Sequence, residues 1–356
     1  MPRRLLRGFF MGDTGFMKRA IELARKGSGC VSPNPMVGAV VMRNGRIIGE
    51  GYHTQYGAPH AEANAIGDRE VAGATLYVTL EPCNHHGHTP PCTERIVSEN
   101  IRRGVVGSID PNPRMQGRSL EWLKKSGIDV EAGVLQDETD GLIRFYSHWI
   151  RTGRPYVTVK LALSCDGFIA GSEKSPQWIS CFESRKDVHR MRAEYDAVLV
   201  GTNTLRVDNP ALTVREVRGR NPNRIIIDRT GRIDHSARVF EDNTDRVFYF
   251  STIRRHDLPA GVHQTPLAPD EFNLLTILKI VGKNNQLSVL VEGGASIAES
   301  FIREGLCNEV VIYRSHTDLG SGIGFDESSV SKHGLKRIDQ TESGLDRKIT
   351  YRREHV

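Results

Sequence analysis

The alternation of predicted strands and helices constrains the fold of this 356-residue chain more than any other feature. Its clearest local signal is Asn44-Gly45, which separates short apolar runs at 37–42 and 46–49 and predicts a hairpin. An amphipathic helix is predicted ahead of the hairpin at 14–26. Further strands are predicted at 75–80, 105–109 and 128–130, and helices at 60–68, 92–99, 117–126 and 137–151. Such alternation is typical of a sheet that is covered by helices.

A break at Thr152-Gly153-Arg154-Pro155 divides the chain, and the alternation starts again with a predicted strand at 156–163. Domains usually contain about 100–200 residues, so a chain of this length is expected to hold two. We therefore predict domains at 14–152 and 153–356, after a leader at 1–13 that is expected to be disordered. Strands are predicted near 197–201, 224–228, 246–250, 287–292 and 309–313, and helices near 184–194, 270–281 and 295–304.

Composition narrows the classes of function. The chain has 48 Lys and Arg against 43 Asp and Glu, a net charge of +5, which weakly favours anionic small-molecule substrates and does not indicate a nucleic-acid partner. No run approaches the ~20 apolar residues that span a bilayer, and the first residues lack the apolar stretch of a signal peptide. Six scattered cysteines are atypical of a disulfide framework. We therefore expect a cytoplasmic protein without a membrane partner.

The strongest chemical signal lies between positions 60 and 92. His60 and Glu62 flank Ala61, and Cys83 and Cys92 each follow a proline. One imidazole and two thiolates suit Zn²⁺ and leave a fourth tetrahedral position open for water. A glutamate that is not a ligand then moves protons, as in the zinc-dependent deaminases of nucleobases. Taken singly, each residue would more often be a helix-start histidine or a core thiol, but the four together favour a metal site.

The spacing of the two cysteines departs from the general deaminase signature. Eight residues, 84–91, separate them, where the signature has two. This segment contains His85, His86 and His88. Because three ligands already complete the usual set, we expect a loop that contacts substrate rather than additional ligands; a solvated loop is the alternative.

At this point a family resemblance becomes specific. The run from Thr79 to Cys92 is similar to the deaminase half of the bifunctional riboflavin-biosynthesis deaminase/reductase family, and so are the motifs Pro33-Asn34-Pro35, Val37-Gly38-Ala39-Val40, Gly51-Tyr52-His53 and Asp110-Pro111-Asn112-Pro113. The resemblance implies an α/β fold, a cytidine-deaminase-like α/β/α sandwich.

The same resemblance assigns roles in the first domain. It implies that His60, Cys83 and Cys92 hold one zinc ion per chain, that Glu62 is the catalytic proton shuttle and that Asn34 contacts the pyrimidinone. The family usually has Arg or Lys where this chain has His88. If that position contacts the substrate phosphate, phosphate affinity here is expected to be altered or to depend on pH.

The second half is less informative by itself. Glu292-Gly293-Gly294-Ala295-Ser296 lies between a predicted strand and a predicted helix, where backbone N–H groups could approach a phosphate. Tight packing explains such a glycine pair equally well, and the G-x-G-x-x-G fingerprint is missing. However, Lys160 to Gly167, Gln177 to Ser180, Gly201 to Thr204 and Asp208 to Arg215 resemble, in order, the reductase half of the same family.

That resemblance implies a dihydrofolate-reductase-like α/β domain that uses NADPH. The residues implied to contact NADPH are Ala162, Trp178, Thr204, Asp208 and a turn made of Gly294, Ala295, Ser296, Ile297, Ala298, Glu299 and Ser300. The residues implied to contact the ribosylaminopyrimidine phosphate are Lys160, Arg192, Leu212, Arg215 and Glu292. Arg192 and Arg215 are suited to phosphate as forked donors, with a surface ion pair as the alternative.

Two residues depart from the reductase pattern: Pro176 stands where a serine is frequent, and Arg229 where a small residue is usual near NADPH. The resulting hypothesis is an enzyme that deaminates a diaminopyrimidinone ribosyl phosphate and then reduces its ribosyl chain. The family tends to associate, so a homo-oligomer is expected. The alternatives are a deaminase with an impaired reductase domain, a tRNA adenosine deaminase-like enzyme and a non-catalytic zinc scaffold; the intact Glu62 argues against a scaffold.

Overall fold

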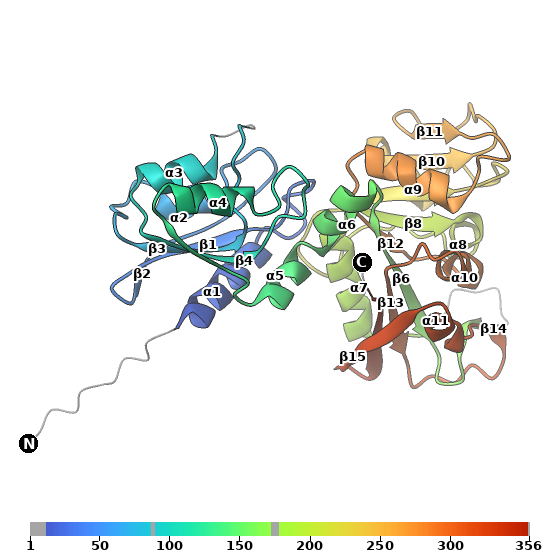
Figure 1. Ribbon diagram of the computed structural model, residues 1–356. Helices are drawn as coiled ribbons and strands as arrows, with labels where there is room; N and C mark the ends of the chain where they lie inside the picture. Colours follow the sequence, from blue (N-terminus) through green and yellow to red (C-terminus); the bar gives the residue numbers. More distant parts are fainter. Residues whose placement is uncertain (1–11, 87–89, 172–177, 355–356) are drawn as a thin grey trace, which may run out of the picture. The chain divides into compact units, whose positions relative to one another are not determined.

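The computed structural model describes residues 12–86, 90–171 and 178–354 (Figure 1). It consists of two compact units, the first ending at Arg151 and the second beginning at Thr152. Of the predicted leader, Gly12 and Asp13 lie within the described residues, and the first helix begins at Asp13. Within the described ranges, no helix is both long and apolar enough to cross a membrane.

Unit 1 is built from five strands and six helices within its described part. The strands are β1 (Gly38–Arg43), β2 (Arg46–Tyr52), β3 (Thr75–Leu80), β4 (Arg103–Ser108) and β5 (Asp129–Ala132). The helices are α1 (Asp13–Arg25), α2 (Ala61–Ile66), α3 (Cys92–Ser98), α4 (Arg118–Lys125), α5 (Gln136–Leu142) and α6 (Arg144–Thr152). The strand order is β2-β1-β3-β4-β5, with β2, β1 and β3 antiparallel and β3, β4 and β5 parallel.

Helices cover both faces of this sheet (Figure 1). Apolar side chains of α2, α3 and α4 pack with one face, and those of α1 and α5 pack with the other. The hairpin is confirmed: Asn44 and Gly45 have φ of 53° and 74°, the left-handed pair that a tight hairpin turn requires. Glycine also sets the spacing of the layers, because a Cβ on Gly51 of β2 would lie 2.3 Å from the backbone nitrogen of Ala65 in α2.

One predicted helix differs. The segment 137–151 forms two helices, α5 and α6, which are separated at Ile143 (φ −99°, ψ 11°). Gly141 lies just before this break, and glycine weakens a helix interior. The amphipathic pattern predicted helix correctly but did not predict the break at Ile143.

Unit 2 contains a nine-stranded sheet. Its described strands are β6 (Tyr156–Leu163), β7 (Phe168–Gly171), β8 (Ala197–Gly201), β9 (Asn223–Ile227), β10 (Val247–Ser251), β11 (His263–Pro266), β12 (Ser288–Val291), β13 (Glu309–Arg314), β14 (Gly322–Gly324), β15 (Leu335–Ser343) and β16 (Asp346–Arg353). Its described helices are α7 (Phe182–Glu194), α8 (Thr202–Asp208), α9 (Leu274–Lys283), α10 (Ala295–Arg303) and α11 (Ser328–Lys332). The order is β11-β10-β9-β8-β12-β6-β13-β16-β15; β7 and β14 form a separate pair.

The seven strands from β11 to β13 run parallel, and β16 and β15 continue the sheet antiparallel. Central strands such as β8 and β12 are buried along nearly their whole length, as expected for a parallel sheet. Carboxyl ends of parallel strands meet at one edge, so the residues that follow β8 and β12 are brought together there. The terminal hairpin β15–β16 was not predicted, although Ser343-Gly344, with Gly344 at φ 62°, is a turn signal.

Candidate functional site

The predicted proton shuttle and its neighbouring ligand lie at the start of α2. His60 is the N-cap residue, with extended backbone (φ −70°, ψ 164°), and Glu62 lies in the first turn. Gly51 lets α2 approach β2 closely, as described above. Glu62 is buried, with only 4% of the residue exposed. Burial raises the pKa of Glu62 to about 7, and the neighbouring Cys83 adds to this shift. A carboxyl group with such a pKa can both accept and release protons near neutral pH.

The two cysteines come from the segment after β3 and from the start of α3. Cys92 is the first residue of α3, and its backbone N–H donates to Cys83 Sγ at 3.3 Å. Thr93 also holds this loop, because its hydroxyl donates to Asn84 Oδ1 at 2.9 Å. A hydrogen bond from Cys92 and a second from His60 lower the pKa of Cys83 to about 4 against the effect of burial. The two cysteines are therefore adjacent in space although eight residues separate them in the sequence.

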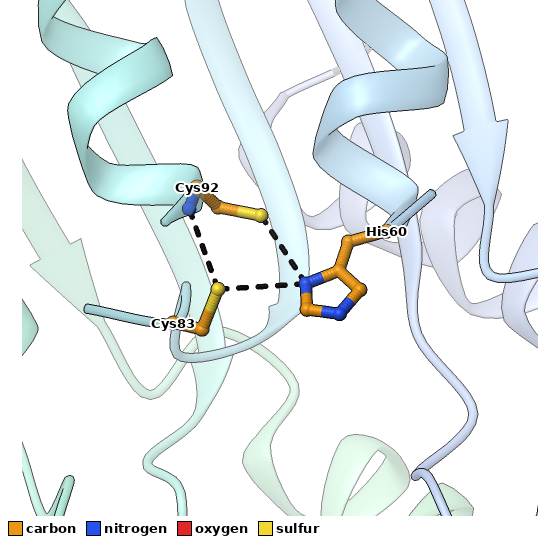
Figure 2. Close-up of side chains that lie close together, drawn as sticks. All are labelled: His60, Cys83 and Cys92. Atoms are coloured by element: carbon orange, nitrogen blue, oxygen red, sulfur yellow. Dashed lines mark hydrogen bonds between the residues drawn. The ribbon is translucent and has the colours of Figure 1, made fainter. Parts of the chain in front are cut away.

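His60, Cys83 and Cys92 converge as a candidate metal site (Figure 2). His60 Nδ1 lies 3.4 Å from Cys83 Sγ and 3.4 Å from Cys92 Sγ. With zinc–sulfur bonds of about 2.3 Å and zinc–nitrogen bonds of about 2.0 Å, a tetrahedral site requires N–S separations of about 3.5 Å. The three donors thus fit zinc, and His60 presents Nδ1 rather than Nε2 to it.

A cavity of about 360 Å³ opens beside these donors. Asn34 lines it, and its side-chain amide nitrogen lies 3.0 Å from Nε2 of His53. Nδ1 of His53 faces the carbonyl oxygen of Pro59 at 3.2 Å, which can only accept, so Nδ1 donates there. Burial lowers the pKa of His53, so the ring is neutral and Nε2 accepts from Asn34. This arrangement leaves the Asn34 carbonyl oxygen as the acceptor for a ligand.

Glu81 of the Glu-Pro-Cys motif also lines the cavity and anchors the loop after β4. Its carboxylate accepts from the backbone N–H groups of Asp110 (3.1 Å), Gly117 (2.8 Å) and Ser119 (3.1 Å), and from the Ser119 hydroxyl. Asp110 in turn accepts from the Tyr146 hydroxyl at 3.2 Å, and burial raises its pKa. The loop after β4 is therefore fixed as a polar wall of the cavity.

The sequence interpretation missed several of these residues. His53, Glu81 and Asp110 stood inside quoted motifs, so a signal existed but no role was assigned to them. Tyr146 and Trp149, which also line the cavity, carried no signal because only the fold brings α6 there. The expectation for His88 concerns a residue outside the described ranges.

In unit 2, the predicted phosphate contacts form a charged group around the end of β12. Arg192 of α7 makes a two-pronged ion pair with Glu292, at 2.5 Å from Nε and 2.9 Å from Nη2, and the two side chains are only 12% and 9% exposed. Burial alone would raise the pKa of Glu292, but Arg192 and then Lys160 hold it below its usual range. Burial lowers the pKa of Lys160, and Glu292 opposes that shift.

Arg215 and Leu212 lie on the loop that follows α8. Arg215 is exposed and its Nη1 donates to the Thr213 hydroxyl at 2.9 Å, whereas Leu212 is 2% exposed. The surface ion pair that was the alternative for Arg192 is not what the structure shows, because its pair with Glu292 is buried. Arg215 has no acidic partner in the described part of the chain.

Several predicted NADPH contacts gather where β8 and β12 end. Thr204 of α8 accepts from the backbone N–H of Gly294 at 3.2 Å, and Gly294 caps α10 with no side-chain cap on the helix. The free first-turn amides of α10 suit an anionic group. Gly293 serves packing, because a Cβ there would lie 1.9 Å from Ile297, whereas a Cβ on Gly294 would make only an ordinary contact, 4.0 Å from Thr204 Oγ1. These residues fit a dinucleotide phosphate.

The other residues that were expected to contact NADPH include the segment 295–300 and Trp178. Of the segment expected to contact NADPH, Gly294 is the N-cap of α10 and Ala295 to Ser300 form its first turns, in agreement with the helix predicted near 295–304. Ala298 is fully buried in the core, and its N–H donates to the carbonyl oxygen of Gly294. The side chains of this segment suit a helix, with apolar Ile297 and Ala298 facing the sheet. Trp178 is 77% exposed and lies under Arg185, whose guanidinium carbon is 4.8 Å from the ring centre.

Asp208 and Ala162 are the remaining residues that were expected to contact NADPH. Asp208 ends α8, and burial raises its pKa while Lys160 opposes the shift. Ala162 lies in β6 beside Tyr313 of β13. Of the two departures, Arg229 donates to the carbonyl of Pro269 at 3.1 Å and lies over the ring of Phe272, and Pro176 falls outside the described residues.

Comparison with known protein families agrees with this division. Residues 11–108 match the zinc-binding region of cytidine and deoxycytidylate deaminases. Residues 155–345 match the RibD C-terminal domain. The two matches cover the converging zinc donors and the charged group around Glu292, respectively.

Relatives match over nearly the whole chain. The riboflavin biosynthesis protein RibD of Aquifex aeolicus (strain VF5) is 40% identical over 92% of this chain and 92% of its own length. RibD of Escherichia coli (strain K12) is 36% identical, with 87% and 89% covered. A diaminohydroxyphosphoribosylaminopyrimidine deaminase/5-amino-6-(5-phosphoribosylamino)uracil reductase from Thermotoga maritima superposes with a TM-score of 0.88 at 39% identity, covering 96% and 98% of the two chains. A structure of Acinetobacter baumannii RibD gives a TM-score of 0.87 at 35% identity, covering 96% and 98%.

Proposed function

Since this chain belongs to the RibD family of riboflavin-biosynthesis proteins, we propose that it catalyses two successive steps of that pathway. The first is hydrolytic deamination of 2,5-diamino-6-ribosylamino-4(3H)-pyrimidinone 5′-phosphate, and the second is NADPH-dependent reduction of the ribosyl side chain to ribityl. The observation that carries the proposal is the convergence of three zinc donors beside the buried Glu62, in one chain with a RibD C-terminal domain. Its cofactors are Zn²⁺ and NADPH.

In the deaminase unit, we assign zinc binding to His60, Cys83 and Cys92. Zinc, when bound there, lowers the pKa of a coordinated water towards neutrality. Glu62 accepts a proton from the attacking water and delivers protons to a ring nitrogen and to the departing amino group. A C–O bond forms at the ring carbon, its C–N bond breaks and ammonia leaves. Asn34, oriented by His53, accepts a hydrogen bond from the pyrimidinone.

In the reductase unit, NADPH, when bound, would supply a hydride to C1′ of the ribosyl group. The bond from C1′ to the ring oxygen would break as that oxygen takes a proton from solvent, which gives the ribityl chain. Arg215 is the cation assigned to bind the substrate phosphate directly, and Lys160 and Arg192 add positive charge near it. Glu292 fixes the Arg192 guanidinium by two hydrogen bonds. Thr204 and the start of α10 receive the dinucleotide.

We assign these activities to domains at 14–152 and 153–356, an assignment that the two compact units support. Neither a tRNA adenosine deaminase nor a zinc scaffold is favoured, because the relatives match both units and Glu62 is placed for catalysis. We also propose a cytoplasmic homo-oligomer with small-molecule substrates and with neither nucleic-acid nor membrane partners. The scattered cysteines and the small net charge support this part of the proposal.

The test is an ammonia-release assay on the diaminopyrimidinone ribosyl phosphate, with zinc content measured in parallel and NADPH oxidation followed afterwards. Wild type is expected to hold about one zinc per chain, release ammonia and then oxidise NADPH. Glu62→Gln is expected to keep zinc and lose deamination by about 10²- to 10⁴-fold, since it removes the proton shuttle but no ligand. Zinc-loaded wild type that releases no ammonia would refute the deaminase assignment, and ammonia without NADPH oxidation would refute the reductase assignment.

A further inference from the structure

The loop from Asn209 to Arg215 has unusual backbone geometry. Asn209 and Leu212 both have positive φ, 40° and 56°. Asparagine tolerates this left-handed region, but leucine seldom adopts it, because its Cβ crowds the following carbonyl oxygen. Leu212 is also buried. Such a conformation persists only where surrounding contacts hold it, and these positions concentrate at functional sites.

Two side chains of α7 hold the loop. Arg192 Nη1 donates to the carbonyl oxygen of Thr213 at 3.1 Å. His189 Nδ1 lies 3.1 Å from the backbone nitrogen of Arg215 and accepts its N–H. Positions three residues apart share one face of a helix, so His189 and Arg192 both reach the loop from the same face of α7 and each makes one hydrogen bond to its backbone. The backbone N–H of Val214 between them donates to Asn221 Oδ1 at 2.8 Å.

His189 is suited to be an acceptor at neutral pH. It is 6% exposed, and burial lowers its pKa to about 4. The cations Arg192 and Arg215 push the pKa in the same direction, and Glu292 and Glu216 oppose them. A neutral ring keeps the lone pair on Nδ1 that the Arg215 N–H requires.

The end of the loop is a place for an anion. Burial, and then the nearby Arg192 and Arg238, lower the pKa of the exposed Arg215 guanidinium, and Glu216 and Glu292 oppose this shift. A phosphate at this point would relieve that repulsion and accept a forked pair of hydrogen bonds. The position of the Arg215 backbone determines the direction in which the guanidinium group presents these two hydrogen-bond donors.

We propose that His189 is a positioning residue for the reductase: through the Arg215 N–H it places the Arg215 guanidinium on the 5′-phosphate of the substrate. This inference rests on the proposed reductase function. It adds a residue that does not touch substrate but sets the enzyme's preference for a phosphorylated over a dephosphorylated ribosylaminopyrimidine. Arg192 cannot take the place of Arg215 at the phosphate. Its Nε and Nη2 atoms donate to Glu292, and its Nη1 atom donates to the carbonyl oxygen of Thr213.

The test compares wild type, His189→Gln and His189→Leu with the deaminated substrate and with its dephosphorylated form, following NADPH oxidation. Leucine has a similar volume but no acceptor, whereas glutamine offers a carbonyl oxygen. In His189→Leu, kcat/KM for the phosphorylated substrate relative to the dephosphorylated one is expected to fall about tenfold, mainly through KM, as for one lost oriented contact. His189→Gln is expected to restore most of the ratio, and the KM for NADPH is expected to remain at the wild-type value in both.

The outcomes separate the inference from the function. Wild type that does not oxidise NADPH, or shows no preference for the phosphorylated substrate, would contradict the reductase proposal itself. If wild type shows the preference and His189→Leu retains it, the positioning role is wrong. Equal losses on both substrates, together with a lower melting temperature, would show that His189 only stabilises the fold, and failure of His189→Gln to recover the ratio would likewise overturn the role of the acceptor.

Discussion

The charged groups of the two candidate sites are balanced in different ways. In unit 1, Cys83, Cys92 and His60 converge and the cation that would balance them is external. In unit 2, Arg192 and Glu292 neutralise each other within the chain although 100 residues separate them. The first site is therefore expected to depend on its ion for both order and activity. The second is expected to be ordered before any ligand binds, and the stability that its ion pair contributes is expected to depend on pH.

The largest effect is expected from removing one zinc donor. Cys83→Ala leaves two of three protein ligands, so zinc content should fall from about one per chain to near zero and deamination by at least about 10³-fold, since the metal activates the water. Reduction of the already deaminated substrate should be unaffected, because no donor lies in unit 2. Metal analysis and the two separate assays measure this.

Cys30→Ala is the matched control, since Cys30 is an exposed thiol of the same unit that lies outside the converging group. It should keep zinc and both activities. Full deamination by zinc-free Cys83→Ala would remove the contrast between the two sites.

A smaller effect is expected from Glu292→Gln. Removing one partner of a buried ion pair costs about 3 kcal/mol of unfolding free energy, because the other charge is left uncompensated. The folded-state pKa of Glu292 is lowered, so its stabilisation is complete above the unfolded-state pKa of about 4.3 and is lost as the pH falls below that value. The difference between wild type and variant should thus be constant from pH 7 to about 5 and shrink at lower pH.

Denaturant unfolding of unit 2 as a function of pH measures this difference. The double variant Arg192→Met with Glu292→Leu is the control, since replacing both partners by apolar groups is much less costly. If the difference for Glu292→Gln grew on acidification, the electrostatic account of this pair would be wrong.

The smallest effect is expected from Lys336→Ala. Lys336 pairs with Glu354 at 2.7 Å, but the two side chains are 67% and 55% exposed. Water and salt screen such a pair, so the change in unfolding free energy should stay below about 0.5 kcal/mol. The same denaturant experiment measures it, and a loss close to that of Glu292→Gln would show that burial is not what distinguishes the two ion pairs.

Much of unit 1 could be predicted because its information is local. The Asn44-Gly45 turn encodes its own backbone geometry, and the strand at 75–80 agrees with the structure residue for residue. The zinc donors were predicted from residue type and from the short motifs around them, since few residue sets suit a tetrahedral metal. Resemblance to a family then identified both units, which comparison with its members confirms.

Tertiary structure alone decided the remaining features. Which nitrogen of His60 faces the thiols, the hydrogen bonds that make His53 an acceptor for Asn34, and the anchoring of the loop after β4 by Glu81 all depend on how elements distant in sequence pack together. The pairing of Arg192 with Glu292 also escaped prediction. Sequence determined which chemical groups this protein has and the local conformations that turns and alternation encode. Their partners, protonation and orientation arise from long-range packing and burial, which no local pattern records.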